Sequence, residues 1–319
     1  MDSNLNDLQK EILKLKNQKN VTILAHYYQP IEIQEVADYL GDSLGLSRIA
    51  RDKTKSKYII FAGVKFMAET ASILNQDKKV LVPTMEACCA LADFLNAKQV
   101  INYKQQYPGV PAITYVNSTA EVKAESDCCC TSSNAAKIVK KMAKKQGVNK
   151  VLFGPDSNLA SYVQQQLPKI EIIKMPETGH CYVHSQITPQ DIDAIKKKYQ
   201  NAKLLVHPEC KKEVRERAEF VGSTAQMYNY VKNTSKKSNG NEFIIGTEKG
   251  LLERMQKDFP SQKFYLAINQ LICRDMKNNN TGFILKILNN LDKTNLEVKV
   301  PKDIARKAMI PLDLMLKYS

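Results

Sequence analysis

The 319-residue sequence lacks any long hydrophobic run. No apolar stretch approaches the ~18 residues that a membrane-spanning helix needs. The N-terminal segment, MDSNLNDLQKEILKLKNQKN, has the pattern of an amphipathic helix and lacks the apolar core of a signal peptide. These absences predict a cytoplasmic protein that does not engage a membrane, or a protein of the plastid stroma if an organelle encodes it.

The sequence also lacks the motifs of nucleic-acid-binding proteins. We find no zinc-finger spacing, no RNA-recognition signature and no basic platform interleaved with aromatic residues. The chain nevertheless carries 47 basic and 33 acidic residues, which gives a net charge of +14. Because the lysines are scattered, mostly on predicted helix faces, we expect this charge to attract small anionic substrates and predict no nucleic-acid partner.

Short apolar segments rich in β-branched residues recur along the chain, with helical or polar stretches between many of them. This pattern predicts an α/β fold with parallel sheets. Ligands of open α/β sheets bind outside the carboxyl ends of the strands. The expected strands are VTILA, KYIIFAG, KVLVP, AITYV, KVLFG, EIIKMP, KLLVH, AEFVG, EFIIG and KFYLAI.

Three segments of the chain share one layout. Each opens with a strand that ends in histidine or tyrosine, at His26, Tyr115 and His207, which are 89 and 92 residues apart. A polar residue follows two positions later in every segment. These residues are Tyr28, Asn117 and Glu209.

The later landmarks of the three segments also correspond. A serine at a predicted helix start comes next, at Ser43, Ser132 and Ser223. A strand ending in glycine and a further strand then lead to one cysteine per segment, and these cysteines are 92 residues apart. They are Cys89, Cys181 and Cys273.

The repeated layout predicts three similar α/β units of ~90 residues, a normal domain size. We expect short parallel sheets around a pseudo-threefold axis, with the active site at the centre. The predicted boundaries are 1–100, with the N-terminal helix, then 101–187 and 188–272. The segment 273–319 carries the third cysteine and is expected to pack back on the first unit.

Three equivalent cysteines at one centre suggest an iron–sulfur cluster with one iron that the protein leaves unligated. Such an iron can act as a Lewis acid. Zinc bound by three cysteines and a histidine is the competing interpretation, because His180 and His184 flank Cys181. Zinc sites usually contain local C-x₂₋₄-C pairs, however, and no such pair joins the three equivalent cysteines.

The remaining cysteines are interpreted as packing residues. The run Cys128–Cys130 lies at a predicted strand-to-helix turn, and the matching places in the other segments hold no cysteine. Three adjacent side chains also cannot easily point at one metal. We expect this run, Cys88 and Cys210 to behave as buried hydrophobic residues.

The serine-bearing helix starts predict anion binding, because a helix N-terminus presents free N–H groups. An ordinary N-cap is the alternative for each of them. We expect His26 and His207 to contact substrate. Glu209 is the best candidate for a general base, with a pKa raised by burial or nearby anions, and Tyr28 could also move a proton. A surface glutamate paired with lysine is the alternative for Glu209.

These motifs together resemble those of the quinolinate synthase family, iron–sulfur enzymes of NAD biosynthesis. The resemblance runs from ILAHYYQ to CRDMKNN and includes GDSLGLS, PTMEACCALAD, YVNSTAEVKAESD, FGPDSNLA, GHCYVH, HPEC and GTEKGLLERM. It implies condensation of iminoaspartate with dihydroxyacetone phosphate to quinolinate, with loss of phosphate and two waters. It also implies a [4Fe–4S] cluster whose ligands are Cys89, Cys181 and Cys273.

The resemblance further implies a set of pocket residues and a functional partner. The implied pocket residues are His26, Tyr28, Ser43, Tyr115, Asn117, Ser132, His207, Glu209, Ser223 and Thr224. Of these, Glu209, Tyr28 and His207 are the expected catalytic residues. An L-aspartate oxidase or an aspartate dehydrogenase is expected to supply iminoaspartate. Because Cys273 has no nearby C-terminal cysteine, we expect no C-x-x-C redox switch of the kind found in some family members.

Two other functions remain open from the sequence. Another iron–sulfur hydro-lyase, acting on a small multiply charged hydroxy acid, would use the same cluster. A non-enzymatic protein that binds RNA or senses redox conditions would use the basic surface and the thiols instead.

Overall fold

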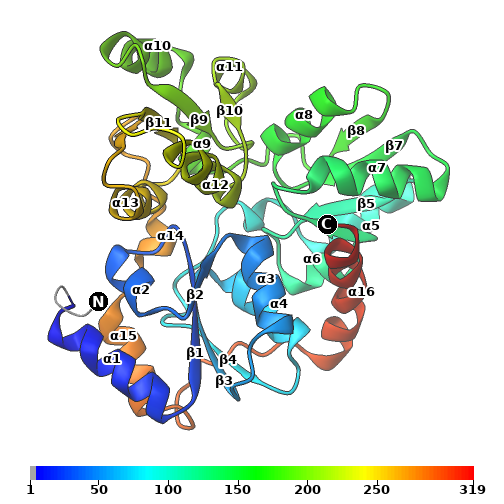
Figure 1. Cartoon of the computed structure of the whole chain (residues 1–319). Coiled ribbons are helices and arrows are strands. Elements are labelled where there is room, and N and C mark those ends of the chain that lie inside the picture. Colours follow the sequence, from blue (N-terminus) through cyan, green and yellow to red (C-terminus); the bar gives the residue numbers. More distant parts are fainter. Residues whose placement is uncertain (1–4) are drawn as a thin grey trace. The chain divides into compact units, whose positions relative to one another are not determined.

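The computed structural model describes residues 5–319 and shows an α/β fold with three four-stranded parallel sheets (Figure 1). The first sheet has the order β2-β1-β3-β4, with β1 (Val21–His26), β2 (Tyr39–Gly41), β3 (Tyr58–Ala62) and β4 (Lys79–Leu81). The second has the order β6-β5-β7-β8, with β5 (Ala112–Tyr115), β6 (Cys128–Cys130), β7 (Lys150–Gly154) and β8 (Glu171–Lys174). The third has the order β10-β9-β11-β12, with β9 (Lys203–Val206), β10 (Phe220–Val221), β11 (Glu242–Gly246) and β12 (Lys263–Leu266).

Helices connect the parallel strands, as parallel pairing requires. The helices up to the end of the second sheet are α1 (Asp7–Gln18), α2 (Ile31–Val36), α3 (Ser43–Asp52), α4 (Lys65–Leu74), η1 (Ala92–Phe94), α5 (Ala97–Gln106), α6 (Ala120–Ala124), α7 (Ala135–Gln146) and α8 (Ser157–Gln166). The later ones are α9 (Tyr182–Ser185), α10 (Pro189–Lys198), α11 (Lys212–Arg215), α12 (Thr224–Ser235), α13 (Lys249–Asp258), α14 (Arg274–Lys277), α15 (Thr281–Asn289) and α16 (Lys302–Tyr318). None of these helices, within residues 5–319, is long and apolar enough to cross a membrane.

The chain divides into two compact units. The first contains the chain up to Cys89 together with Cys273–Lys302, and the second contains Ala90–Ile272 and Asp303–Ser319. The three similar sheets confirm the predicted α/β repeats. The bounds of the four predicted segments and the pseudo-threefold axis stay predictions.

In the first unit, α1 and α15 pack against the first sheet. Ile12 of α1, Ile60 of β3 and Ile284 of α15 belong to one buried cluster with their aliphatic neighbours. Each such side chain contributes roughly 1.5–3 kcal/mol when it is fully buried. The amphipathic pattern of the N-terminal segment therefore predicted α1 correctly. A capping box between Asn6 and Gln9 starts this helix.

Two short edge strands, β2 and β6, were missed by the sequence analysis. The cysteine run forms β6 and pairs in parallel with Ile113–Tyr115, so its placement in a turn was wrong. All three cysteines are fully buried, and their interpretation as packing residues is confirmed. A strand of three residues carries too little alternation to be recognised from its pattern alone.

Candidate active site

Glu209 lies in a buried hydrogen-bonded cluster just beyond the end of β9. Its side chain is 3% exposed, and its Oε2 atom accepts a hydrogen bond from Nδ1 of His184 at 2.7 Å. The other ring nitrogen of His184, Nε2, lies 2.8 Å from the hydroxyl of Thr247. The ring of His207 stacks on that of His184, with the ring centres 4.4 Å apart. Glu209 is therefore held by histidines in the interior and is not a surface residue paired with lysine.

These surroundings lower the pKa of Glu209 to about 2. Burial by itself raises this pKa, but the charge of His207 and the hydrogen bond and charge of His184 favour the ionised carboxylate more strongly. The expectation of a raised pKa is therefore wrong. That expectation considered only the effects of burial and of nearby anions on the pKa. The repeat pattern did not indicate that His184 would contact Glu209.

Tyr115, at the end of β5, joins the same cluster from the second sheet. Its buried hydroxyl is hydrogen-bonded to Glu209 and to Ser132. Burial raises the pKa of Tyr115 well above its usual value, and the negative charge of Glu209 adds to the shift. Tyr115, Ser132, His207 and Glu209, all singled out from the sequence, thus belong to one connected group of side chains.

The amide oxygen of Asn117, two residues beyond Tyr115, is buried and has no hydrogen-bond partner among residues 5–319. A buried acceptor without a donor destabilises a protein by roughly 1–3 kcal/mol. Such an atom is a suitable acceptor for an N–H or O–H group of a ligand.

Cys181 immediately precedes α9 and lies close to Glu209. Its sulfur, a ring nitrogen of His184 and a carboxylate oxygen of Glu209 all lie within 4.8 Å of one another. The backbone N–H of Cys181 donates to Oδ2 of Asp156 at 3.0 Å, and Asp156 is fully buried. Thiolate, imidazole and carboxylate are all metal-binding groups, so these side chains are compatible with a metal site.

The three repeat-matched cysteines follow loops that are fixed in the same way. In each repeat, the N–H of the first residue of a helix donates to the carbonyl oxygen two residues before the cysteine. The distances are 2.8 Å for Lys65 and Ala87, 2.7 Å for Ser157 and Gly179, and 2.8 Å for Lys249 and Leu271. Cys89, Cys181 and Cys273 are all partly exposed. This shared local structure supports treating the three as one set, although Cys181 belongs to a different compact unit from the other two.

The other cysteines differ from this set. Cys210 and the run Cys128–Cys130 are buried, and burial raises the pKa of each thiol, to about 11 for Cys129. They are thus kept as neutral thiols, as expected of packing residues. Cys88, in contrast, is exposed. The prediction that it is a buried hydrophobic residue was wrong, because the loop before Cys89 turns its side chain outward.

In the first unit, His26 and Tyr28 form a pair at the end of β1. Their rings meet edge to face with centres 4.5 Å apart, and both side chains are buried. Nδ1 of His26 accepts a hydrogen bond from the backbone N–H of Tyr28 at 3.1 Å. The same contact recurs at the end of β9, where Nδ1 of His207 accepts from the N–H of Glu209 at 3.3 Å. The proposed equivalence of the two histidines therefore has a local structural basis.

The three serines all lie at helix starts but play different local roles. Ser43 is the first residue of α3, and Asp42 caps that helix. Ser132 lies before α7, whose cap position is Asn134. Ser223 caps α12 through a capping box, and the buried Thr224 is the first residue of that helix. Only Ser223 therefore fits the alternative interpretation as an ordinary N-cap.

Sequence reasoning missed two members of the cluster and misjudged a third. Thr247 directly follows the glycine that ends β11, and Asp156 lies two residues after the glycine that ends β7. Ligands of parallel sheets bind at such strand ends. That position was a usable signal for both. His184 was considered only as a zinc ligand beside His180. His180 instead bonds to a neighbouring backbone carbonyl through Nδ1.

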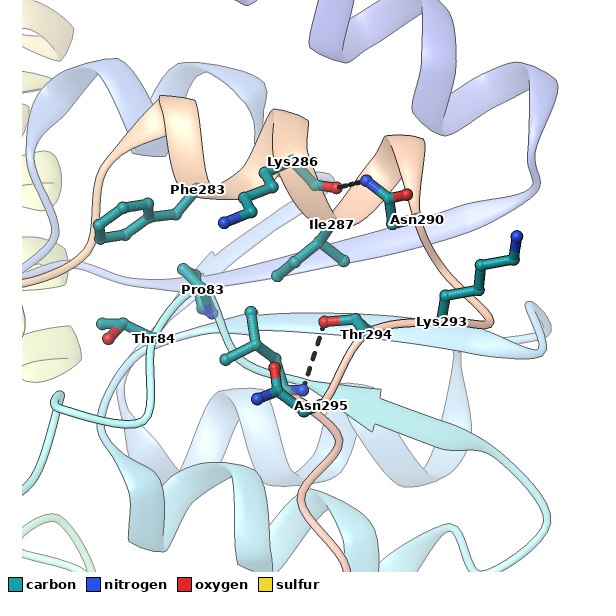
Figure 2. Close-up of a pocket in the computed structure, with 10 residues that line it drawn as sticks. Pro83, Thr84, Phe283, Lys286, Ile287, Asn290, Lys293, Thr294 and Asn295 are labelled. Carbon is teal, nitrogen blue, oxygen red and sulfur yellow. Dashed lines mark hydrogen bonds between the residues drawn. The ribbon is translucent and has the colours of Figure 1, made fainter.

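A pocket of about 480 Å³ lies elsewhere in the first unit, between α15 and the segment that follows it (Figure 2). Figure 2 shows Phe283, Lys286 and Ile287 of α15 along one side and Thr294 and Asn295 on the other. None of the residues that line it belongs to the sequence-predicted site, so we do not include it in the active site.

Comparison with known proteins agrees with these features. The family model for quinolinate synthetase A protein (NadA) matches residues 10–317. A quinolinate synthase of Clostridium kluyveri is 47% identical over 97% of this chain and 97% of its own length. The enzyme of Pyrococcus abyssi is 46% identical over 98% of this chain and 100% of its own length. That of a Thermotoga strain is 44% identical over 95% of this chain and 96% of its own length. The repeats, the matched cysteines and these similarities together lead to one conclusion: the chain belongs to the quinolinate synthase family of enzymes.

Proposed function

We propose that this chain condenses iminoaspartate with dihydroxyacetone phosphate to quinolinate, with release of phosphate and two waters. Family membership supports the reaction. The structural observation that carries the proposal is the buried cluster around Glu209, which brings two histidines and a tyrosine to the carboxyl ends of parallel strands. Preorganised donors and proton-transfer groups of this kind suit a reaction of multiply charged substrates.

His26 and His207 are proposed to bind substrate oxygens. In each of them Nδ1 accepts a backbone N–H. An imidazole ring carries a proton at Nε2 both when it is neutral and accepts at Nδ1 and when it is the charged imidazolium. Both side chains then offer an Nε2–H donor to a carboxylate or phosphate. The buried Asn117 oxygen offers the complementary acceptor for a substrate N–H or O–H. Ser43, Ser132, Ser223 and Thr224 are proposed as further anion-binding donors at helix starts.

Glu209, Tyr28 and His207 are proposed to move protons. With its pKa near 2, Glu209 is a carboxylate at neutral pH before substrate arrives. A bound anion raises that pKa, because like charges disfavour ionisation. Glu209 can then take a proton from substrate and share it through its hydrogen bonds with His184 and Tyr115. Tyr28, which packs on His26, is assigned to the protonation of a leaving hydroxyl.

We propose that Cys89, Cys181 and Cys273 hold a [4Fe–4S] cluster. Thiolates are the usual ligands of such clusters, and these three partly exposed residues follow equivalent loops. When bound with three cysteine ligands, the cluster supplies an iron that acts as a Lewis acid toward a hydroxyl or carboxylate. His184 and Glu209 lie within 4.8 Å of Cys181, so proton-transfer groups of this chain stand beside one proposed ligand.

Two-electron oxidation of the amine of aspartate yields iminoaspartate. We propose an L-aspartate oxidase or an aspartate dehydrogenase as the functional partner, with no nucleic-acid partner and no membrane association. A cytoplasmic location stays a prediction.

The test is an anaerobic assay of the iron- and sulfide-reconstituted protein with both substrates. The proposal predicts equimolar formation of quinolinate and inorganic phosphate, and neither product when one substrate is omitted. A fully loaded protein that forms no quinolinate but dehydrates a small hydroxy acid would instead support the alternative hydro-lyase.

A further inference from the structure

A buried hydrogen-bond donor stands eight residues after each of the three matched positions His26, Tyr115 and His207. The donors are Gln34, Lys123 and Arg215. Each belongs to the short helix that follows a strand-end loop, respectively α2, α6 and α11. Nothing in the sequence analysis singled them out, since a glutamine, a lysine and an arginine share no obvious pattern.

In the first repeat, the side-chain amide of Gln34 fixes the loop that carries Tyr28. Its Nε2 atom donates to the carbonyl oxygens of Tyr27 and Gln29, both at 2.9 Å. These two carbonyls flank Tyr28 directly. Anchoring one carbonyl before Tyr28 and one after it restricts the backbone of this loop, and therefore the direction of the Cα–Cβ bond of Tyr28.

In the third repeat, the guanidinium of Arg215 makes the equivalent contacts around Glu209. Its Nη1 atom donates to the carbonyl oxygens of Pro208 at 3.3 Å and Cys210 at 2.5 Å. Nη2 of Arg215 also reaches the side chain of Gln165 in α8 at 3.0 Å. The loop is thereby held against a neighbouring helix as well as against α11.

In the second repeat, the ammonium of Lys123 donates to the carbonyl oxygen of Ser118, directly after Asn117. Lys123 is fully buried. The hydroxyl of Ser118 in turn donates to the carbonyl of Tyr115 at 2.9 Å. Burying an ammonium is costly unless its protons are hydrogen-bonded, so this contact gives the buried position of Lys123 a physical reason.

We propose that Gln34, Lys123 and Arg215 are positioning residues that aim Tyr28, Asn117 and Glu209 at the substrate. The inference rests on the proposed function. Three chemically different side chains, from the same repeat position, donate to the carbonyl oxygen three residues after the matched strand end, that of Gln29, Ser118 or Cys210. What they share is the donated hydrogen bond and not their shape or charge, which argues against a role in packing alone. Small displacements of a catalytic group are costly to turnover.

The experiment compares Lys123→Met, which removes the donor at similar length, with Lys123→Gln, which restores a donor of the kind found in the first repeat. We expect hydrogen exchange in residues 116–119 to accelerate in the Met variant and to stay near the parent rate in the Gln variant. At equal iron loading, kcat should fall roughly 10- to 100-fold with Met but only about threefold with Gln. Iron content should not change, since no cluster cysteine lies on this loop.

The matched control is Lys16→Met. Lys16 is also buried and donates to a backbone carbonyl, that of Val36 at 2.8 Å, but outside the strand-end loops. This variant should melt at a lower temperature and keep its kcat. Should Lys123→Met fail to fold, Gln34→Met provides the same comparison in the first repeat, with residues 27–30 as the exchange readout.

The proposal is overturned if the Met variant keeps the parent turnover and loop exchange, or if the folded Gln variant is as impaired as the Met variant. Loop exchange is measured in protein without a cluster and without substrate. A parent chain that makes no quinolinate therefore disproves the proposed reaction, whereas unchanged exchange disproves only the positioning role.

Discussion

Nδ1 of His184 lies 2.7 Å from Oε2 of Glu209, deep in the second unit. His184 stands three residues after Cys181, whereas Glu209 follows a strand of the third sheet. The contact therefore ties the loop of one proposed cluster ligand to the carboxylate proposed as the base. Any change that displaces Cys181 is expected to disturb the hydrogen bonding of Glu209 as well.

Replacing a proposed cluster ligand should abolish iron binding. Serine in place of Cys89, Cys181 or Cys273 leaves only two thiolates, which hold an iron–sulfur cluster poorly. We expect iron and acid-labile sulfide in the purified variants to fall close to zero. Cys88→Ser, which changes the exposed neighbour of Cys89, is the matched control and should keep the parent iron content. Normal iron in the Cys273 variant would refute the ligand assignment.

Air should inactivate the protein. A cluster with an open iron is exposed to oxidants, so activity and the visible absorption of the cluster should be lost together in air. Reconstitution with iron and sulfide under reducing conditions should restore both. Full activity in an aerated sample shown by metal analysis to contain no iron would rule out a role for the cluster.

The cysteines should differ in reactivity toward iodoacetamide. The pKa of Cys129 is raised to about 11 by burial, so at pH 8 this residue remains a neutral thiol, and the thiolate is the nucleophile. We expect mass spectrometry of the native protein to find the exposed Cys88 alkylated and Cys128, Cys129 and Cys130 unmodified until denaturant is added. Rapid modification of Cys129 in the folded protein would contradict its buried position in β6.

Alanine variants of Ser132 and Thr188 should distinguish a serine that binds substrate from a threonine that stabilises a helix. Ser132 does not cap a helix, so Ser132→Ala should leave the melting temperature nearly unchanged. It should weaken substrate binding by roughly 10- to 100-fold, as expected when a hydrogen bond to a charged group is lost. Thr188 caps α10 through a capping box, and Thr188→Ala should lower the free energy of unfolding by about 1 kcal/mol. Calorimetry and KM values check both. A Thr188 variant that loses activity without losing stability would contradict the assignment of Thr188 as a purely structural helix cap.

Much of the fold could be predicted because the repeat period carries information that single elements lack. The equal spacing allowed the strands, serines and cysteines of the three segments to be matched with one another. The structure shows equivalent backbone hydrogen bonds before all three matched cysteines. The edge strands β2 and β6 escaped detection, because three residues are too few to show alternation.

The site was less predictable than the fold. Tyr115 and Glu209 follow from the repeat, and Asp156 could have been found from its place after a glycine-ended strand, but His184 acts through a contact between elements that no spacing reveals. The direction of the pKa shift of Glu209 was misjudged for this reason, because it depends on the imidazole rings of His184 and His207, which come from different parts of the chain. The exposure of Cys88 likewise depends on how one loop turns.

The most direct test of the account is anaerobic quinolinate formation by Glu209→Gln at the same iron loading as the parent. Glutamine keeps the shape of the side chain and removes its basic carboxylate. The account predicts a folded protein that retains its cluster and binds quinolinate, with turnover lowered roughly 10²-fold or more, the usual contribution of acid–base catalysis. Turnover within a few-fold of the parent would contradict it and would leave Tyr28 as the remaining candidate for the base.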